Sequence, residues 1–434
     1  MRPSTALKTD HYELTMLQAA LRSGAAHRRS VFEVFARRLP AGRRYGVVAG
    51  TGRLLEALED FRFGPEEIAH LESLGVFDAA TLDFLRDFRF SGDIYGYAEG
   101  EAYFPNSPIL IVESTFAEAC ILETLVLSIL NHDSAIASAA ARMTVAAGTR
   151  PCIEMGSRRT HEDAAVAAAR AAVIAGFAST SNLEAGRDYG LKTTGTAAHS
   201  FTLLHDSEEA AFRAQVATLG AGTSLLVDTY DVEQGIRTAV KVAGPELGAI
   251  RLDSGDLVTQ AGWARELLDS LGNERTGIVV TSDLDEYAIA ALASAPVTAY
   301  GVGTKLVTGS GAPTSSMVYK LVARENEDGE WVSVAKKAKD KVSVGGRKYA
   351  LRRLDERGIA TAEVVGVGHR PEGDHNDRPL LTQLVTGGEI VREATGAEGV
   401  RRAAERFRRS LAELPVAYTR LTEGEPVIPT VLED

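Results

Sequence analysis

The stretch GAIRLDSGD, residues 248–256, runs from a short apolar strand into a polar loop, and a helical pattern follows to about Leu271. The stretch TGIVVTSD, residues 276–283, repeats this order, with a helix expected from Asp285. Repeated strand–loop–helix units predict a parallel sheet with helical crossovers, and so many in one row favour a barrel over a two-half open sheet. Further units begin with strands expected at 152–154, 177–179, 192–195, 224–228 and 297–300.

Chemically active side chains gather at the predicted carboxyl ends of these strands. In a parallel barrel the loops that follow the strands emerge on one face, and that face carries the site. A random scatter of polar residues would not produce this placement. The residues that fall there are Arg158, His199, Asp228, Arg251, Asp253, Asp256, Asp283 and Thr304.

The bulk composition is that of a globular protein with more than one domain. The chain has 434 residues, of which 45% are apolar and 24% charged, so two domains are the natural expectation. The formal net charge is −12. An acidic excess argues against general binding to nucleic acids or anionic membranes, because these partners require clustered Lys and Arg. It does not exclude a small phosphate ligand, which needs only local donors.

The two cysteines, Cys120 and Cys152, lie in apolar segments. They are too few for a disulfide framework and show no zinc-binding spacing, so we expect buried, reduced thiols. No apolar run reaches the roughly 20 residues that a membrane-spanning helix needs. The first ten residues lack the apolar core of a signal peptide. These features predict a cytoplasmic protein.

The loop RLDSGD, residues 251–256, carries the strongest local signal. Two aspartates close together after a buried strand suit a ribose diol or a Mg²⁺ ion, because carboxylates accept hydroxyl groups and hold hard cations. Gly255 lets backbone N–H groups approach a ligand closely, and the helix start that follows favours a phosphate. The alternative is that an aspartate caps the helix and the loop is an ordinary turn.

Two further loops suit an anionic ligand. Arg158 follows the strand expected at 152–154, and arginine binds phosphate or carboxylate through its planar fork, although a solvated helix start is the alternative. The segment GVGT, residues 301–304, can cradle a phosphate, but glycine turns after strands are common. The chain has neither the GxGxxG fingerprint of dinucleotide binding nor a P-loop.

His199 lies in the segment GTAAHS, residues 195–200, whose small side chains leave room for a ligand or for a phosphoryl group on the ring. A lone histidine at a strand end is more often structural, so a function for His199 depends on its neighbours. No GxSxG elbow occurs and no cysteine accompanies a histidine, which disfavours an acyl-transfer triad.

Taken in order along the chain, six motifs resemble those of the nicotinate phosphoribosyltransferase family. They are TDHYELTM (9–16), EMGSRR (154–159), STSN (179–182), GTAAHSF (195–201), RLDSGD (251–256) and GVGT (301–304). The resemblance implies an α/β fold with an incomplete (β/α) barrel of the type II phosphoribosyltransferase kind. It also implies a second, α+β domain built from both chain ends, and a homodimer. We expect residues 1–118 to begin this α+β domain, residues 119–325 to form the barrel with the active site, and residues 326–434 to pack on the N-terminal domain.

The resemblance also implies an activity. The phosphoribosyl group of 5-phosphoribosyl 1-pyrophosphate would be transferred to nicotinate, giving nicotinate mononucleotide and pyrophosphate, in NAD biosynthesis and salvage. Mg²⁺ would act at the barrel mouth. ATP would be a co-substrate that transiently phosphorylates a histidine, a position that His199 matches, which gives the enzyme a ligase-type classification.

Five residues match positions that surround the pyridine ring in the family. Tyr12 would stack on the ring from the partner subunit, and Thr196 and Arg251 would hold nicotinate, with Arg251 pairing with the carboxylate. Several relatives carry an aromatic residue where this chain has Met155, so one face of the ring would contact a thioether. Nicotinamide-using relatives carry an aspartate at the position of Ser181. Serine does not repel a carboxylate, which favours nicotinate over nicotinamide.

The remaining matched positions bind the ribosyl diphosphate. Arg158, Gly303 and Thr304 would bind phosphates. Asp253 would act in catalysis by holding ribose or metal, and Asp256 is a candidate second metal ligand.

Other functions stay open at this stage. A nicotinamide phosphoribosyltransferase is the main alternative, and a quinolinate-using enzyme would need a second carboxylate site. A catalytically silent sensor of pyridine metabolites is disfavoured because His199, Arg251 and Asp253 are all present, and a dehydrogenase is disfavoured by the missing fingerprint. The sequence assigns no role to Asp228, Asp231 or Asp283, nor to the polar loop 369–378.

Overall fold

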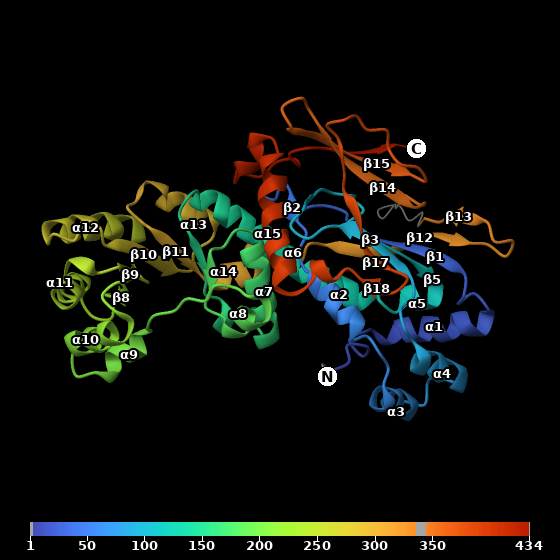
Figure 1. Ribbon diagram of the computed structural model, residues 1–434, viewed down its shortest axis with the longest axis horizontal. Helices are drawn as coiled ribbons and strands as arrows, with labels where there is room; N and C mark the ends of the chain where they lie inside the picture. The colour runs from blue at the N-terminus through green and yellow to red at the C-terminus, as the bar shows by residue number, and fades with distance from the viewer. Residues whose placement is uncertain (1–2, 336–343, 434) are drawn as a thin grey trace. The chain divides into compact units, whose positions relative to one another are not determined.

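The computed structural model describes residues 3–335 and 344–433. The chain forms two compact units: residues 1–138 together with 312–434, and residues 139–311 (Figure 1). The first unit is therefore built from both ends of the chain. Residues 336–343 of the expected C-terminal part lie outside the described residues.

The second unit is organised around a six-stranded parallel sheet with the strand order β7-β6-β11-β10-β9-β8. Its strands are β6 (Cys152–Glu154), β7 (Ser179–Thr180), β8 (Ser224–Leu226), β9 (Ala249–Leu252), β10 (Gly277–Ser282) and β11 (Ala299–Val302). The first strand in sequence, β6, pairs with the last, β11, whereas β7 and β8 are the open edges. A cyclic order with one gap is consistent with a partial barrel.

The gap lies where the pattern predicted one more strand, at residues 192–195. Only Thr193 pairs there, in an isolated parallel bridge with Thr180. The predicted strand is wrong because the segment KTTG has no apolar side chain to bury under a covering helix. Residues 194–198 instead run as irregular backbone.

Helices alternate with the strands of the second unit, as the pattern predicted. Several begin at a side chain that caps the first turn: Asn182, Asp231 and Asp256 each accept a backbone N–H three residues ahead. Such caps stabilise a helix by about 1 kcal/mol and fix where it starts. The helices are α7 (Glu162–Ile174), α8 (Leu183–Tyr189), α9 (His199–Leu204), α10 (Glu208–Leu219), α11 (Val232–Ala243), α12 (Leu257–Ser270), α13 (Glu286–Ala291) and α14 (Thr304–Val307).

The first unit contains a seven-stranded antiparallel sheet with the order β13-β12-β1-β5-β3-β17-β18. Its strands are β1 (Arg29–Ala36), β3 (Asp93–Tyr97), β5 (Leu110–Thr115), β12 (Met317–Glu325), β13 (Trp331–Ser333), β17 (Leu381–Thr386) and β18 (Glu389–Ile390). A four-stranded sheet has the order β16-β14-β15-β19, formed by Arg378–Pro379, Lys348–Leu354, Ala360–Val367 and Thr430–Glu433. Two short strands, β2 (Gly46–Val47) and β4 (Ala102–Tyr103), pair with each other.

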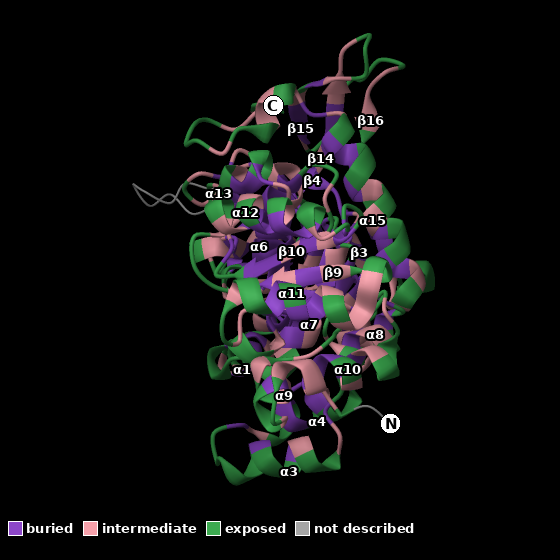
Figure 2. Ribbon diagram, turned by 90° about the vertical axis from the view of Figure 1, so that its left-hand side faces the viewer, coloured by how far each residue is buried: buried purple, intermediate pink, exposed green. Residues whose placement is uncertain are grey.

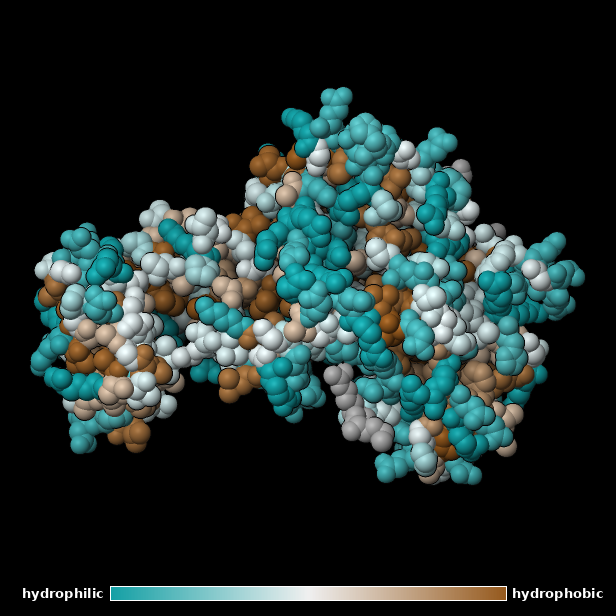
Figure 3. All heavy atoms as spheres, in the orientation of Figure 1, coloured by the Kyte–Doolittle hydropathy of each residue, from teal (hydrophilic) through white to brown (hydrophobic). Residues whose placement is uncertain are grey.

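Helices α1 to α6 bury apolar side chains in one large core of the first unit. Leu14 and Leu17 of α1 and Leu125 and Leu130 of α6 belong to the same buried cluster. The outer face of α15 is rich in arginine and glutamate and forms a hydrophilic band near the middle of Figure 3. The helices are α1 (His11–Ser23), α2 (Thr51–Glu59), α3 (Pro65–Ser73), α4 (Ala79–Asp87), α5 (Phe116–Cys120), α6 (Glu123–Ala147) and α15 (Gly396–Ala412).

The borders of the units differ from those expected. Segments 119–138 and 312–325, which we expected in the barrel, belong to the first unit. Strand β12 pairs along its length with β1, from Ala36 opposite Met317 to Ser30 opposite Arg324. The first half of α6 contributes Leu125 to the core of that unit. Backbone pairing and core burial therefore set these borders.

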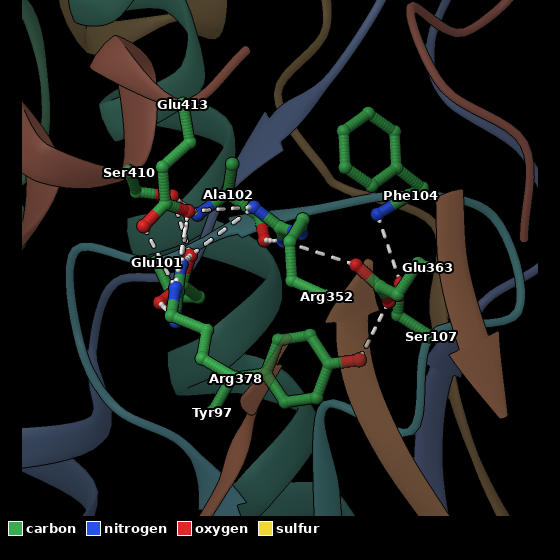
Figure 4. Close-up of polar contacts among 10 residues, drawn as sticks. All are labelled: Tyr97, Glu101, Ala102, Phe104, Ser107, Arg352, Glu363, Arg378, Ser410 and Glu413. Atoms are coloured by element: carbon green, nitrogen blue, oxygen red, sulfur yellow. Dashed lines mark hydrogen bonds and ion pairs between the residues drawn. The ribbon is translucent and has the colours of Figure 1, made fainter. Parts of the chain in front are cut away.

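A buried ionic network joins the four-stranded sheet to strand β4 and the residue before it (Figure 4). Arg352 is 0% exposed, pairs with Glu363 at 3.0 Å and donates to the carbonyl oxygen of Ala102 at 2.8 Å. Glu101 lies 3.4 Å from Arg352 and 2.8 Å from Arg378. Burial by itself would raise the pKa of Glu101, but these two arginines hold it below its usual value. The arrangement stabilises charges that would otherwise be costly to bury.

The strands of the parallel sheet are deeply buried: Ile250 and Leu252 of β9 and Ile278 and Val280 of β10 are 0% exposed (Figure 2). Cys152, at the start of β6, is a free buried thiol, as is Cys120, which confirms the expectation of unpaired cysteines. Burial raises the pKa of Cys152 to about 12. Among the residues described, no helix is long and apolar enough to span a bilayer.

Candidate active site

A cavity of about 540 Å³ opens in the second unit at the carboxyl ends of the parallel strands. Loops after β6, β7, β9, β10 and β11 line it, as expected for the face of a parallel barrel that carries the site. The irregular segment 194–198 forms another part of its wall. Eight residues predicted from the sequence lie together in this lining: Met155, Arg158, Ser181, Thr196, Arg251, Asp253, Gly303 and Thr304.

Arg251, in strand β9, contributes a largely buried guanidinium to the cavity. Its Nη2 donates to the carbonyl oxygen of Ala197 at 3.0 Å, and its Nη1 lies 3.4 Å from the Thr196 hydroxyl. Its Nε is buried and has no hydrogen-bond partner within the described residues. Burial lowers the pKa of the Arg251 guanidinium, although Asp253 and Asp228 oppose this shift. A desolvated guanidinium of this kind is suited to a carboxylate or phosphate of a ligand.

A carboxylate cluster surrounds the loop after β9. Asp228 is 2% exposed, and its Oδ2 accepts the Asp253 backbone N–H at 2.8 Å and the Ser254 hydroxyl at 3.0 Å. The other oxygen, Oδ1, is buried and finds no hydrogen-bond partner in the described part of the chain. Asp253 accepts the Thr281 hydroxyl through Oδ1. Asp228 thus fixes the loop that presents Asp253 and keeps one oxygen atom unsatisfied.

His199 begins helix α9 and lies against this cluster. Its Nδ1 is 3.1 Å from the Thr229 hydroxyl. Its Nε2 is 3.7 Å from Asp228 Oδ1 and 3.9 Å from Asp253 Oδ2. The side chain is 41% exposed. The structure therefore brings His199 together with Asp253, as the sequence predicted, in a ring position that remains accessible to a ligand.

Two of the aspartates noted in the sequence cap helices. Asp256 accepts the backbone N–H of Thr259 at 3.3 Å and its hydroxyl at 2.7 Å, and it is not among the cavity-lining residues. Asp231 caps α11 by accepting the N–H of Gln234 at 2.8 Å. Asp283, in contrast, lines the cavity. In the structure Asp256 therefore caps a helix. The role of Asp256 as a metal ligand stays a prediction.

Close packing fixes the cavity floor. Glu154, at the end of β6, accepts the backbone N–H of Gly156 and the Thr180 hydroxyl, while burial raises its pKa. A Cβ atom on Gly301 would lie 2.4 Å from Thr281 Cγ2 and 2.8 Å from the Met155 sulfur, so glycine lets both side chains pack closely against β11. The sequence reasoning missed the anchoring role of Glu154, whose position at a strand end was the available signal.

Tyr12 lies in α1 of the first unit and is 44% exposed. Burial and the nearby Glu123 and Glu13 raise its pKa. Glu13 is itself buried and accepts the backbone N–H of Thr124 at 2.9 Å, which ties the start of α1 to the start of α6. The motif 9–16 is thus an anchored helix start that carries an exposed aromatic ring, and the stacking role of Tyr12 stays a prediction.

The fold and the cavity define an α/β protein whose parallel sheet is consistent with a partial barrel and whose cavity lies at the carboxyl ends of the strands. Residues 7–131 match the family model described as nicotinate phosphoribosyltransferase (NAPRTase) N-terminal domain. The chain is 59% identical to nicotinate phosphoribosyltransferase pncB1 of Mycobacterium tuberculosis, over 98% of this chain and 94% of that protein. It is 38% identical to the nicotinate phosphoribosyltransferase of Bacillus subtilis, over 86% and 76% of the two chains. The crystal structure of human nicotinic acid phosphoribosyltransferase matches with a TM-score of 0.83 and 25% identity, over 98% of each chain. The chain belongs to the nicotinate phosphoribosyltransferase family.

Proposed function

We propose that this protein transfers the phosphoribosyl group of 5-phosphoribosyl 1-pyrophosphate to nicotinate in NAD biosynthesis, within a homodimer whose barrels are of the type II phosphoribosyltransferase kind. The observation that carries the proposal is the convergence of Arg251, Ser181 and Asp253 on one cavity. A buried guanidinium with one unsatisfied N–H, a neutral hydroxyl and a carboxylate suit an aromatic acid and a ribosyl diphosphate.

Nicotinate recognition rests on the charge of the cavity wall. The carboxylate of nicotinate pairs with the Arg251 guanidinium, whose partial desolvation strengthens such a pair. Met155 contacts one face of the pyridine ring, and Tyr12 of the partner subunit covers the other. The Thr196 hydroxyl, 3.4 Å from Arg251, orients the guanidinium toward the ligand.

The diphosphate and ribose bind on the other side of the reacting carbon. Arg158, Gly303 and Thr304 hold phosphate oxygens. The donor set around Asp253 fits Mg²⁺, because this ion is usually held by one or two carboxylates together with substrate phosphates and water, and the described residues offer no larger ligand group. When bound there, Mg²⁺ supplies positive charge to the departing diphosphate.

The reaction breaks the bond between ribose C1 and the diphosphate oxygen and forms a bond between C1 and the pyridine nitrogen. Positive charge develops on the ribose as pyrophosphate leaves with the bonding electrons. The nitrogen attacks with its own lone pair, so no strong general base is required. The protein contributes by aligning the two reactants and by placing Asp253 and Arg158 near the charges that develop.

ATP coupling proceeds through His199. The terminal phosphoryl group of ATP moves to an imidazole nitrogen with release of ADP, and water later hydrolyses the phosphohistidine to inorganic phosphate. The Asp228 and Asp253 carboxylates, 3.7 and 3.9 Å from Nε2, orient the imidazole ring for this transfer. Phosphorylation adds negative charge beside Asp253 and orders the diphosphate site.

An assay with ribosyl diphosphate, Mg²⁺ and ATP tests the proposal, with nicotinate, nicotinamide and quinolinate supplied in parallel. We expect mononucleotide from nicotinate alone, with turnover raised by ATP in the wild type and not in His199→Ala. Product from nicotinamide would favour the alternative, a nicotinamide phosphoribosyltransferase. Absence of product from all three would contradict the proposed function.

Ser181→Asp tests the choice between acid and amide. An aspartate in this lining position would repel the carboxylate of nicotinate, so we expect kcat/KM for nicotinate to fall by about tenfold or more. Ser181→Asn, which has a similar volume and no charge, is the matched control and should retain most of the activity. Equal losses in the two variants would show that volume rather than charge is responsible.

A further inference from the structure

A second cavity, of about 450 Å³, lies entirely within the first unit. Its volume falls within the range of roughly 300–1,000 Å³ that is typical of small-molecule sites. Tyr95 of β3 and Leu381 of β17 supply an apolar wall and pack against a buried cluster of the large sheet. The remaining wall comes from β14 and from residues 370–377, part of the polar loop 369–378 that the sequence left without a role.

Asp374 and Asp377, two acidic residues of this polar loop, help to hold it in place. Asp374 accepts the backbone N–H of Asn376 at 2.7 Å. Asp377 pairs with Arg353 at 3.4 Å, and Arg353 also donates to the carbonyl oxygen of Glu372 at 2.9 Å. The loop is therefore held in place without a ligand, and Asp374 and Asp377 take part in holding it.

Two guanidinium groups converge on one aromatic ring in the cavity. The Arg347 Cζ lies 3.9 Å from the centroid of the Tyr349 ring, and the Arg370 Cζ lies 5.6 Å from the same centroid. Arg347 is also 5.0 Å from the Tyr95 ring and is paired with Glu113 at 2.7 Å. Arg370 is exposed and forms no ion pair with any residue that the structure describes. Of these two cations, Arg347 has a carboxylate partner and Arg370 has none among the described residues, while the lining also contains the carboxylates of Asp374 and Asp377.

The third arginine of the lining, Arg378, already has carboxylate partners. It is paired with Glu101 at 2.8 Å and with Glu413 at 2.6 Å. Among the described residues, Arg370 is therefore the lining arginine that lacks a carboxylate partner. A guanidinium that stacks on a ring keeps its N–H bonds in its own plane, so its donors remain available to an anion.

We propose that this cavity is a binding site for a mononucleotide, an anion that carries a phosphate and a flat ring. Arg370 and the Nη2 of Arg347 hold the phosphate, and the ring packs against Tyr95 and Leu381. The site consists only of residues of the first unit, so it is separate from the cavity assigned to the transfer reaction and does not depend on that assignment.

Equilibrium dialysis of the full chain with AMP, in buffer free of phosphate, tests this inference. We expect Arg370→Ala to bind AMP at this site at least about tenfold more weakly, because a charge-assisted phosphate contact is lost. Arg370→Lys keeps the charge without the planar fork and should recover part of the affinity. Arg357→Ala, which removes an exposed arginine outside the cavity, is the matched control and should bind as the wild type does. Arg251→Ala, which changes the other cavity, should still bind AMP at this site.

Three outcomes would overturn the inference. Unchanged AMP affinity in Arg370→Ala would show that Arg370 does not contact the phosphate. Loss of AMP binding in Arg251→Ala would show that AMP binds in the other cavity. Inorganic phosphate that binds as tightly as AMP would show a simple anion site with no role for the ring. Because Arg370 is exposed, a melting temperature equal to that of the wild type is expected and ensures that the comparison concerns binding.

Discussion

Asparagine in place of Asp253 should lower kcat for mononucleotide formation by about 10²–10³-fold, the usual cost of removing one electrostatic group from a reacting centre. The amide oxygen can still accept the Thr281 hydroxyl, and the Asp253 backbone N–H still donates to Asp228, so the loop keeps its shape. What is lost is a negative charge beside the ribose and the proposed magnesium ion. Initial rates over a range of nicotinate concentrations should show the loss in kcat, with a smaller change in KM for nicotinate.

Asp256→Asn is the matched control because it lies three residues further along the same loop. Its carboxylate caps α12 through Thr259, so we expect a small loss of stability and turnover within a few-fold of the wild type. A loss of activity as large as that of the Asp253 variant would instead support both aspartates as metal ligands. Near-normal turnover of Asp253→Asn would remove Asp253 from the catalytic centre.

The convergence of the site could be predicted because it follows from local patterns and one topological rule. Arg251, Asp253 and Thr304 lie at or just after the ends of short apolar strands in the sequence, and parallel strands bring their carboxyl ends to one face. The same reasoning identified Asp256 as either a ligand or a cap. A helix start and a site loop use the same residues, Asp, Ser and Gly, so sequence patterns cannot separate the two roles.

Features that depend on distant partners could not be predicted. The unsatisfied oxygen of Asp228 becomes visible only when the loop after β9 folds over it. The unit borders depend on the pairing of β12 with β1, which joins Met317 to Ala36 across most of the chain. The strand expected at residues 192–195 had the right position in the repeat but no apolar side chain to hold it in a sheet.

Arg352→Met should destabilise the first unit by about 3–5 kcal/mol, the range expected when one partner of a buried ion pair is removed. Methionine fills a similar volume, so the loss reflects charge rather than a cavity. Glu101 retains Arg378, but Glu363 is 0% exposed and would keep only the hydroxyl donors of Tyr97 and Ser107. Chemical denaturation at neutral pH, followed by far-ultraviolet circular dichroism, measures the change in the free energy of unfolding.

A second substitution and a pH series separate this charge effect from poor packing. Burial already raises the pKa of Glu363, and Arg352 is the largest influence that opposes the shift. Without Arg352 the folded-state pKa rises further above the unfolded value, so the variant is penalised most at high pH and regains stability as the pH falls through that pKa. Glu363→Gln in the Arg352→Met background removes the ionisable group and should restore part of the stability at neutral pH while abolishing this pH dependence. A single variant whose deficit is the same at pH 5 and pH 8 would show that the cost comes from packing, because an unpaired buried carboxylate must become less costly once it is protonated.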